Sequence, residues 1–354
     1  MEEAPCLWEK KKFGQKMLLI TRELGLLNTQ LRIKREDDAV LIPLLRLPSE
    51  EEQAAITKRC HEVRIASNCF SERKKQGKTL QEALDDKLAP PLLAKLPHSM
   101  DIIGQVAIVD VDPELEEYKH QLGQAILQTK VNIKTVLAKV GAISGEFRTR
   151  DFEVIAGTSE TETIYREYGC AYLLDPRDVY FSPRLSQERW KVAQQVRDGE
   201  VVVDMFAGVG PYSIQIAKKH CTAKVYAIDT NNRAIYFLNR NIGVNKVNNV
   251  YAFHGDAREV IEKNLIGNAD RVIMNLPEKA IEFIDIACKA LQSVGGVIHY
   301  YGFEEEPKPL EKVEEKLATT IMESGKMVKK ILGSRLVRSI APRKWQVAID
   351  LLVI

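Results

Sequence analysis

The chain has 354 residues, of which 45% are apolar and 28% charged, and its formal net charge is +2. Because this is about twice the usual length of one domain, we expect two or three domains, each with its own core. No apolar run approaches the roughly 18 residues of a membrane span, and the N-terminal segment MEEAPCLWEKKKFGQK lacks the apolar core of a signal peptide. We therefore expect a cytoplasmic, monomeric protein with no membrane partner.

The cysteines and histidines are spaced too irregularly for a metal site. The six cysteines form no C-x-x-C pair, and the six histidines form no H-x-x-x-H pattern. We predict no metal and no disulfide framework. Seven basic residues and no acid lie between Lys326 and Lys344, at positions 326, 329, 330, 335, 338, 343 and 344. Such a cluster indicates either a polyanion partner or only a solvated surface, and both interpretations stay open.

Two smaller units precede the longest one. In residues 1–69 a basic, helix-like start from Trp8 is followed by a strand, DAVLIPLL, and by a helix, SEEEQAAITKRC, with Ser49 as its N-cap. The polar stretch SERKKQGKTLQ then predicts a linker. In residues 83–184 we expect a strand at DIIGQVAIVDV, a helix at ELEEYKHQLGQAILQTK and an extended return at IKTVLAKVGAISGEFRTR.

Residues 185–354 alternate strands with helical segments. The runs EVVVDMF, AKVYAIDT, NVYAFHGD, DRVIMNL and GGVIHYYGF predict five parallel strands of a doubly wound α/β sheet. The last two extended runs are separated only by APRK, which is too short for a parallel crossover, so they predict an antiparallel hairpin. The result is a mixed sheet of seven strands in a Rossmann-like domain, preceded by two smaller α/β or α+β domains.

A small-molecule site is predicted where the first of these strands ends, in VVDMFAGVGPYSI. Gly208 and Gly210 allow a tight turn and a close approach of the backbone to a ligand. A dehydrogenase is the competing interpretation. However, its G-x-G-x-x-G pattern requires glycine where Ser213 stands, and Pro211 removes a backbone donor that a diphosphate could use.

Three acids stand at three successive strand ends. Asp204 precedes the glycines and suits an amine-bearing ligand, Asp229 can hold a ribose diol, and Asp256 can accept from an adenine amino group. Each acid alone could equally be a helix N-cap. Together with the terminal hairpin they favour S-adenosylmethionine over NAD as the cofactor.

The fourth strand ends in DRVIMNLPEKA. Many methyltransferases that modify exocyclic amines of bases carry a polar residue, two prolines and an aromatic residue at this place, whereas this sequence has only Asn275, Leu276 and Pro277. Asn275 can supply an amide at the reacting edge of a base and Pro277 a rigid wall, but neither is a general base.

These motifs, with GEFRTRDFEVIAG, VYFSPRLSQER and SIAPRKWQVAID, closely resemble the archaeal and eukaryotic tRNA (guanine-37-N1)-methyltransferase family. The resemblance implies a class I methyltransferase domain that transfers a methyl group from S-adenosylmethionine to N1 of the guanine beside the anticodon of tRNA. It also implies that residues 1–69 assist tRNA binding and that Phe206 and Asn275 contact the cofactor.

Methylation of N1 requires a general base, because the ring proton must leave. The resemblance places Glu188 beside the guanine as that base, Arg148 at O6 to stabilise negative charge, Tyr180 near the methionine moiety and Arg184 near the RNA backbone. Other roles stay open for the first three: Glu188 as a helix-start carboxylate paired with Arg189 or Lys191, Arg148 as a phosphate contact, and Tyr180 as core packing. Two rival functions are a wybutosine-pathway aminocarboxypropyl transferase and a non-catalytic RNA-binding protein.

Overall fold

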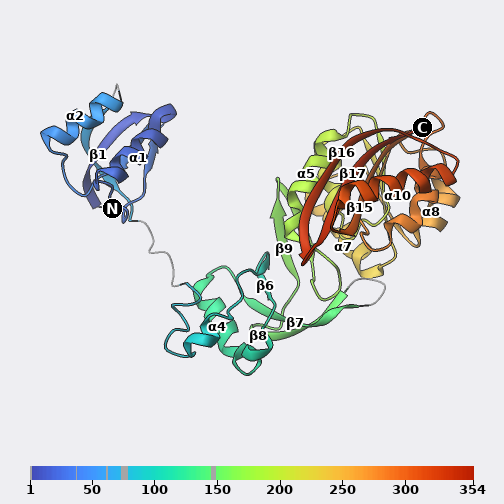
Figure 1. Cartoon of the computed structure of the whole chain (residues 1–354), viewed down its shortest axis with the longest axis horizontal. Helices are drawn as coiled ribbons and strands as arrows, with labels where there is room; N and C mark the ends of the chain where they lie inside the picture. Colours follow the sequence, from blue (N-terminus) through green and yellow to red (C-terminus); the bar gives the residue numbers. More distant parts are fainter. Residues whose placement is uncertain (1, 37, 61–62, 73–78, 145–148) are drawn as a thin grey trace. The chain divides into compact units, whose positions relative to one another are not determined.

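The structure is a computed structural model that describes residues 2–36, 38–60, 63–72, 79–144 and 149–354 (Figure 1). The chain separates into two compact units, Met1–Thr79 and Leu80–Ile354. The predicted domain borders, 1–69, 83–184 and 185–354, remain a prediction.

The first unit is a four-stranded antiparallel sheet with two α-helices. Its strand order is β2-β3-β1-β4, and its elements are β1 (Glu2–Lys10), η1 (Lys11–Phe13), α1 (Gly14–Glu23), β2 (Lys34–Glu36), β3 (Ala39–Pro43), α2 (Glu50–Arg59) and β4 (Arg64–Phe70). The predicted cap is confirmed, because Ser49 and Glu52 form a reciprocal capping box at α2. The helical start predicted from Trp8 is wrong: residues 8–10 end strand β1, which pairs with β3 and β4, and α1 begins only at Gly14.

The second unit begins with a small sheet of order β5-β6-β7-β8. Its elements are α3 (Pro90–Leu93), β5 (Asp101–Ile103), β6 (Val106–Val109), η2 (Pro113–Tyr118), α4 (Lys119–Thr129), β7 (Thr135–Ser144) and β8 (Thr149–Gly157). The single strand predicted at DIIGQVAIVDV is two antiparallel strands, because the chain turns at Gly104 with φ +57°. A Cβ at Gly104 would lie 2.5 Å from the carbonyl oxygen of Ile164, so only glycine fits. A hairpin of β9 (Thr163–Glu167) and β10 (Cys170–Leu174) follows.

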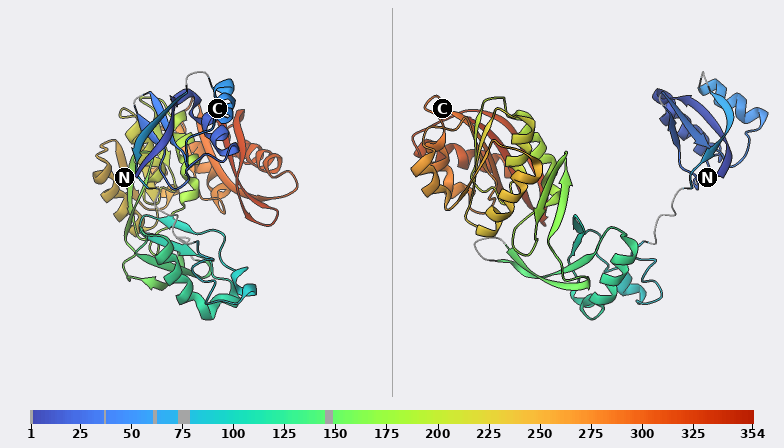
Figure 2. Two further views of the ribbon diagram at one scale, coloured as in Figure 1. Left: turned by 90° about the vertical axis from the view of Figure 1, so that its left-hand side faces the viewer. Right: turned by 180° about the vertical axis from the view of Figure 1, so that it is seen from behind.

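The largest sheet has seven strands in the order β13-β12-β11-β14-β15-β17-β16, with helices on both faces (Figures 1 and 2). The strands β11 to β15 are parallel, and the pairings of β17 with β15 and of β16 with β17 are antiparallel. The predicted fold class and terminal hairpin are therefore confirmed. The elements are η3 (Pro183–Leu185), α5 (Ser186–Gln195), β11 (Val201–Asp204), α6 (Pro211–Lys219), β12 (Lys224–Asp229), α7 (Asn232–Asn245), β13 (Val250–His254), α8 (Ala257–Asn264), β14 (Arg271–Met274), η4 (Ala280–Phe283), α9 (Ile284–Ala290), β15 (Gly296–Glu305), α10 (Pro309–Glu323), β16 (Val328–Ala341) and β17 (Lys344–Val353).

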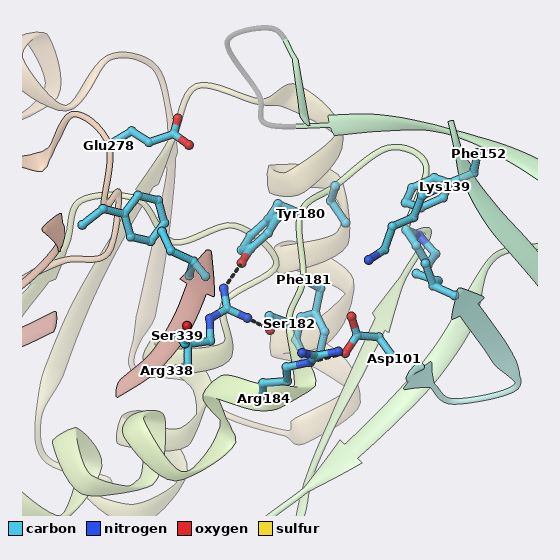
Figure 3. Close-up of a pocket in the computed structure, with 15 residues that line it drawn as sticks. Asp101, Lys139, Phe152, Tyr180, Phe181, Ser182, Arg184, Glu278, Arg338 and Ser339 are labelled. Atoms are coloured by element: carbon cyan, nitrogen blue, oxygen red, sulfur yellow. Dashed lines mark hydrogen bonds and ion pairs between the residues drawn. The ribbon is translucent and has the colours of Figure 1, made fainter. Parts of the chain in front are cut away.

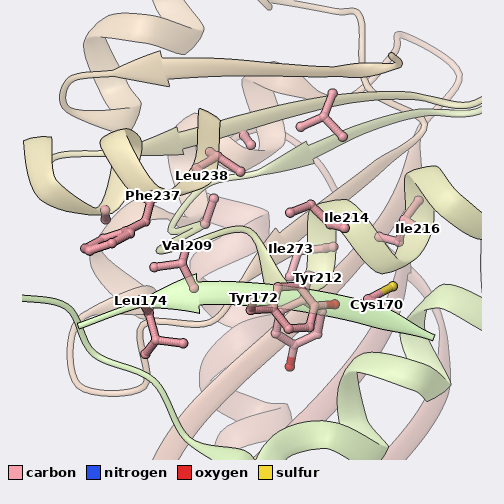
Figure 4. Packing of buried hydrophobic residues seen from close by; sticks show 14 of the residues in the cluster. Cys170, Tyr172, Leu174, Val209, Tyr212, Ile214, Ile216, Phe237, Leu238 and Ile273 are labelled. Carbon is pink, nitrogen blue, oxygen red and sulfur yellow. The ribbon is translucent and has the colours of Figure 1, made fainter. Parts of the chain in front are cut away.

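One apolar core lies on each face of this sheet. On one face, α5, α6 and α7 bury Val192, Ile214 and Phe237 together with Tyr172 of β10 (Figure 4). On the other face, α8, η4, α9 and α10 bury an aliphatic cluster that includes Ile261, Ile284, Ile286 and Leu317. This double cover explains why the strand sequences are continuously apolar and do not alternate.

Within the described ranges, no helix is long and apolar enough to cross a membrane. In the same ranges, no group of three or more histidine, cysteine or acidic side chains could hold a metal ion.

Candidate active site

The carboxyl ends of β11, β12, β13 and β14 lie side by side and form the floor of a cavity of about 200 Å³. Five of the predicted cofactor residues line it, namely Phe206, Gly208, Asp229, Asp256 and Asn275. The sequence brings them together because parallel strands present their carboxyl ends at one edge.

The turn after β11 is fixed by its two glycines and by Asp229. Gly208 (φ +54°) and Gly210 (φ +85°) both have left-handed backbone conformations. The backbone N–H of Gly208 donates to Asp229 Oδ2 over 2.7 Å, and that of Asn231 donates to Asp229 Oδ1 over 2.9 Å. Gly210 does not line the cavity. A Cβ there would lie 2.4 Å from Leu238 Cδ1, so Gly210 serves the packing of α6 against α7.

Asp204 lies behind the cavity wall and not in it. Its side chain is fully buried, and Oδ2 accepts a hydrogen bond of 2.7 Å from Ser213 Oγ. Burial raises the pKa of Asp204 to about 7, with the hydrogen bond from Ser213 opposing and the nearby charge of Asp229 adding to that rise. Burial also raises the pKa of Asp229, against the two backbone donors that favour its charged form.

Asp256 is a helix cap that also lines the first cavity, and its contact with an adenine stays a prediction. It is the N-cap of α8, because its side chain accepts from the backbone N–H of Arg258 over 2.7 Å, and it also lines the cavity. Asn275 lines the opposite wall. Its Oδ1 atom is buried and has no hydrogen-bond partner among the described residues. An acceptor of this kind fits a ligand that brings its own N–H or O–H group.

A second cavity of about 390 Å³ adjoins the first (Figure 3). Both cavities are lined by residues 179–182 and by Glu278. We call residues 179–182 the common wall. The other walls come from β5, β6, β7 and β8 on one side and from β15 and β16 on the other, through Asp101, Ile108, Lys139, Phe152, Phe303, Arg338, Ser339 and Ile340.

Of the predicted substrate-binding residues, Tyr180 and Arg184 line a cavity and Pro277 does not. Tyr180 lies in the common wall, and Arg184 lines the second cavity, where its Nε donates to Asp101 Oδ1 over 2.7 Å. Pro277 is buried and lines neither cavity. Asn275 and Leu276, which precede it, line the first cavity. Arg148 lies outside the described residues.

Arg338 is a site residue that sequence reasoning missed. Its Nη2 donates to Tyr180 Oη and its Nη1 to Ser182 Oγ, both over 3.3 Å, and its Nε donates to Gln346 Oε1 over 2.8 Å (Figure 3). The Arg338 guanidinium on β16 therefore holds the common wall in place through Tyr180 and Ser182. The only sequence signal was its membership of the basic cluster between Lys326 and Lys344.

Glu188 lies in the first turn of α5 and is only 5% exposed. Its Oε1 accepts from Lys191 Nζ over 2.9 Å, which is one of the pairings considered from sequence, and its Oε2 accepts from Arg335 Nε over 2.6 Å. It lines neither cavity. The neighbouring Arg189 does line the first cavity, and it pairs with Glu167 over 2.6 Å and not with Glu188.

A seven-stranded mixed sheet with a terminal antiparallel hairpin, and with a cavity of acids at its strand ends, defines a class I methyltransferase fold. The comparisons agree with this class. Residues 163–328 match the TRM5/TYW2 methyltransferase domain, residues 80–161 the TYW2 N-terminal domain, and residues 10–52 the tRNA methyltransferase 5 N-terminal domain. The chain is 42% identical to the tRNA (guanine(37)-N(1))-methyltransferase Trm5b of Pyrococcus abyssi, over 93% of this chain and 92% of that protein. The chain belongs to the archaeal and eukaryotic-type tRNA (guanine-37-N1)-methyltransferase family, which confirms the resemblance seen in the sequence.

Solved structures give the same result. The crystal structure of Pyrococcus abyssi Trm5b matches with a TM-score of 0.73 and 38% identity over 99% of both chains. A complex of aTrm5 with tRNALeu matches with a TM-score of 0.67 and 32% identity over 98% of this chain and 99% of the other. Methanocaldococcus jannaschii TYW2 in complex with AdoMet matches with a TM-score of 0.57 and 31% identity, over 72% of this chain and 99% of the other.

One relative has a different activity. The tRNA(Phe) (4-demethylwyosine(37)-C(7)) aminocarboxypropyltransferase of Pyrococcus horikoshii is 35% identical, over 77% of this chain and 96% of that protein.

Proposed function

We propose that this protein transfers a methyl group from S-adenosylmethionine to N1 of guanosine 37 in tRNA. The observation that carries the proposal is the pair of adjoining cavities with a common wall at residues 179–182, one at the strand ends of a methyltransferase sheet and the other reaching to β5, β7 and β8. A small cofactor in the first and a nucleotide in the second meet at this wall. The family and the tRNA complex of a relative supply the identity of the nucleic acid.

The residues that line the first cavity suit the chemistry of S-adenosylmethionine. The Asp229 carboxylate, held by two backbone donors, has lone pairs left to accept from a ribose diol, and Asp256 and Phe206 flank the space for an adenine. The unpartnered Oδ1 of Asn275 can accept from an amino group. When bound, S-adenosylmethionine supplies the methyl group that its sulfonium carries.

The chain's own residues would orient the guanine and remove one proton. Tyr180 lies in the wall common to the two cavities, Asn275 lines the first cavity, and Pro277 stiffens the turn that carries Asn275. In this proposal Glu188 accepts the N1 proton on a carboxylate oxygen, and Arg148 stabilises the negative charge that grows on O6. Arg184, at the rim of the second cavity, contacts the RNA backbone.

The first unit would add affinity for tRNA without taking part in the chemistry. Arg22, Arg32 and Arg35 line a cavity of about 400 Å³ in that unit, and none of the three forms an ion pair with a described residue. Arginines without carboxylate partners are suited to phosphate oxygens. The same proposal makes the protein a cytoplasmic, monomeric enzyme.

The aminocarboxypropyl alternative is less supported, because that relative covers 77% of this chain against 93% for Trm5b. Two forms of S-adenosylmethionine separate the functions: one labelled in the methyl group, the other in the carboxyl carbon of the methionine moiety. We expect only the methyl label to enter a tRNA transcript with G37, and none to enter the same transcript with A37. Transfer of the carboxyl label to a tRNA that carries 4-demethylwyosine at position 37, tested in parallel, would support the rival enzyme. Absence of both labels from both tRNAs would support a non-catalytic RNA-binding protein.

A further inference from the structure

A continuous chain of polar side chains crosses the large sheet and ends at Glu188. We call it the polar chain. Its links are Arg271 Nη1 to His299 Nε2 (2.8 Å), His299 Nδ1 to Asp350 Oδ1 (2.7 Å), Arg335 Nη1 to Asp350 Oδ2 (2.8 Å) and Arg335 Nε to Glu188 Oε2 (2.6 Å). The first four members come one each from β14, β15, β17 and β16, which are successive neighbours in the sheet.

The direction of each hydrogen bond in the polar chain is fixed. An arginine can only donate, so His299 Nε2 accepts from Arg271, and the ring proton must sit on Nδ1 and point at Asp350. Burial lowers the pKa of His299, which agrees with a neutral ring. Although burial opposes it, the hydrogen bond from His299 and the charge of Arg335 hold the pKa of Asp350 well below its usual range. Asp350 is therefore an anion that accepts from neutral His299 on Oδ1 and from Gln195 and the Arg335 cation on Oδ2.

The Arg335 guanidinium thus donates to two carboxylates, Asp350 and Glu188. Asp350 anchors Nη1, which leaves Nε directed at Glu188, and the exposed fractions of the side chains fall from 20% at Arg335 to 6% at Glu188 and 4% at Asp350. A side chain with this anchoring loses little further freedom when it holds a carboxylate in one direction. The two ends of the contact lie 147 residues apart in the chain.

We infer that Arg335 is the positioning residue for Glu188, and that the terminal hairpin fixes the direction of this carboxylate through the polar chain. The inference rests on the proposed function, in which Glu188 accepts the N1 proton of guanine. A base contributes only when its oxygen lies within hydrogen-bond reach of that proton. Without Arg335 the Glu188 carboxylate would retain, among the described residues, only its hydrogen bond from Lys191 of α5.

The other groups that face Glu188 cannot replace Arg335. Lys191 is 49% exposed, so solvent screens its charge. Tyr301 of β15 and Tyr212 of α6 also interact with Glu188, and burial raises the pKa of both phenols, so they stay neutral. Arg335 is therefore the cation expected to control both the position of Glu188 and the pH at which the reaction proceeds.

The test measures single-turnover methyl transfer at saturating tRNA and cofactor, as a function of pH. In the parent enzyme we expect the rate to rise with pH and then level off. Arg335→Gln should slow transfer by about tenfold or more at pH 7, because it misdirects the carboxylate. It should also move the half-plateau point of the rate profile to higher pH, because an opposite charge is lost beside the reacting groups. Arg335→Lys, which keeps the charge, should restore most of the shift.

Three further variants separate the role of Arg335 from general effects. Lys329→Gln removes the same charge from an exposed position on the same strand and should leave the pH profile in place. Lys191→Gln should move the half-plateau point less than Arg335→Gln does. In a Glu188→Gln background, Arg335→Gln should cause no further loss of rate, because there is no base left to position.

The outcomes identify which idea fails. If Arg335→Gln lowers the rate with an unchanged profile and no rescue by lysine, Arg335 is only structural and the inference is overturned. A full additional loss on the Glu188→Gln background would equally overturn it. If Glu188→Gln alone transfers methyl at the parent rate and profile, the proposed base is wrong. If Arg335→Gln fails to fold because Asp350 is left unpaired, the double variant Arg335→Gln with Asp350→Asn is used instead, because it removes both charges. The same shift of the half-plateau point is then expected.

Discussion

Asp204 should make the protein less stable as the pH rises, and Asp204→Asn should remove that effect. Its folded pKa of about 7 exceeds the ordinary value of 3.8, so between these limits the unfolded chain has ionised while the folded protein still holds a proton. The contribution of Asp204 to stability is therefore largest below about pH 4, falls by about 1.4 kcal/mol per pH unit, and levels off above about pH 7. The whole penalty is about 4 kcal/mol, of which about 2 to 3 kcal/mol develops between pH 5 and pH 8.

The assay is urea unfolding of the protein without ligands at pH 5 and pH 8, followed by circular dichroism. We expect the free energy of unfolding of Asp204→Asn, relative to the parent, to increase by about 2 to 3 kcal/mol between the two pH values, since other groups cancel in the difference. Asp86→Asn, at an exposed position, should show no such change. A difference between Asp204→Asn and the parent that does not vary with pH would show that Asp204 is ionised in the folded protein and would refute the reasoning.

Four predictions concern binding and catalysis. Asp229→Ala should weaken S-adenosylmethionine binding by at least tenfold in calorimetry, because it removes the acceptor for the ribose and loosens the Gly208 turn. Unchanged affinity would contradict the assignment of the cofactor to this cavity. Deleting residues 1–79 should raise the KM for tRNA and leave cofactor affinity and single-turnover rate intact, and a collapse of that rate would reveal a catalytic role for the first unit. Arg338→Gln should lower kcat/KM for tRNA by about 10- to 100-fold with little effect on cofactor affinity, because the common wall loses two hydrogen bonds. Arg343→Gln, at a side chain 77% exposed, is the matched control. Equal effects of the two substitutions would refute a specific role of Arg338. Glu188→Gln should slow single-turnover transfer by roughly 10²- to 10⁴-fold without weakening the binding of tRNA or cofactor, and a parent-like rate would leave Glu188 as a helix-start carboxylate.

The sequence predicted which residues line the first cavity because these residues follow a local rule. Asp229 closes β12, and Asp256 and Asn275 come just after β13 and β14, so parallel pairing alone brings them to one edge. The terminal hairpin was predictable for a similar reason, because the four-residue connection APRK permits only an antiparallel return.

Contacts between distant segments were not predictable in this way. Residues 8–10, the end of strand β1, were interpreted as part of a basic helical start, and the partner strand β4 lies more than 50 residues away. The turn at Gly104 lies inside an apolar run and depends on its contact with Ile164. The bond between Arg335 and Glu188 likewise depends on the order of strands in the sheet, which no local pattern records.

The most direct test of the central claim is mass spectrometry of a tRNA transcript after incubation with the protein and S-adenosylmethionine. The transcript is digested to nucleosides to identify the product, and a parallel digest to oligonucleotides locates it. The account predicts 1-methylguanosine, in the fragment that contains position 37 and in no other. A guanosine methylated at another atom, a nucleoside that carries an aminocarboxypropyl group, or 1-methylguanosine at another position would contradict it.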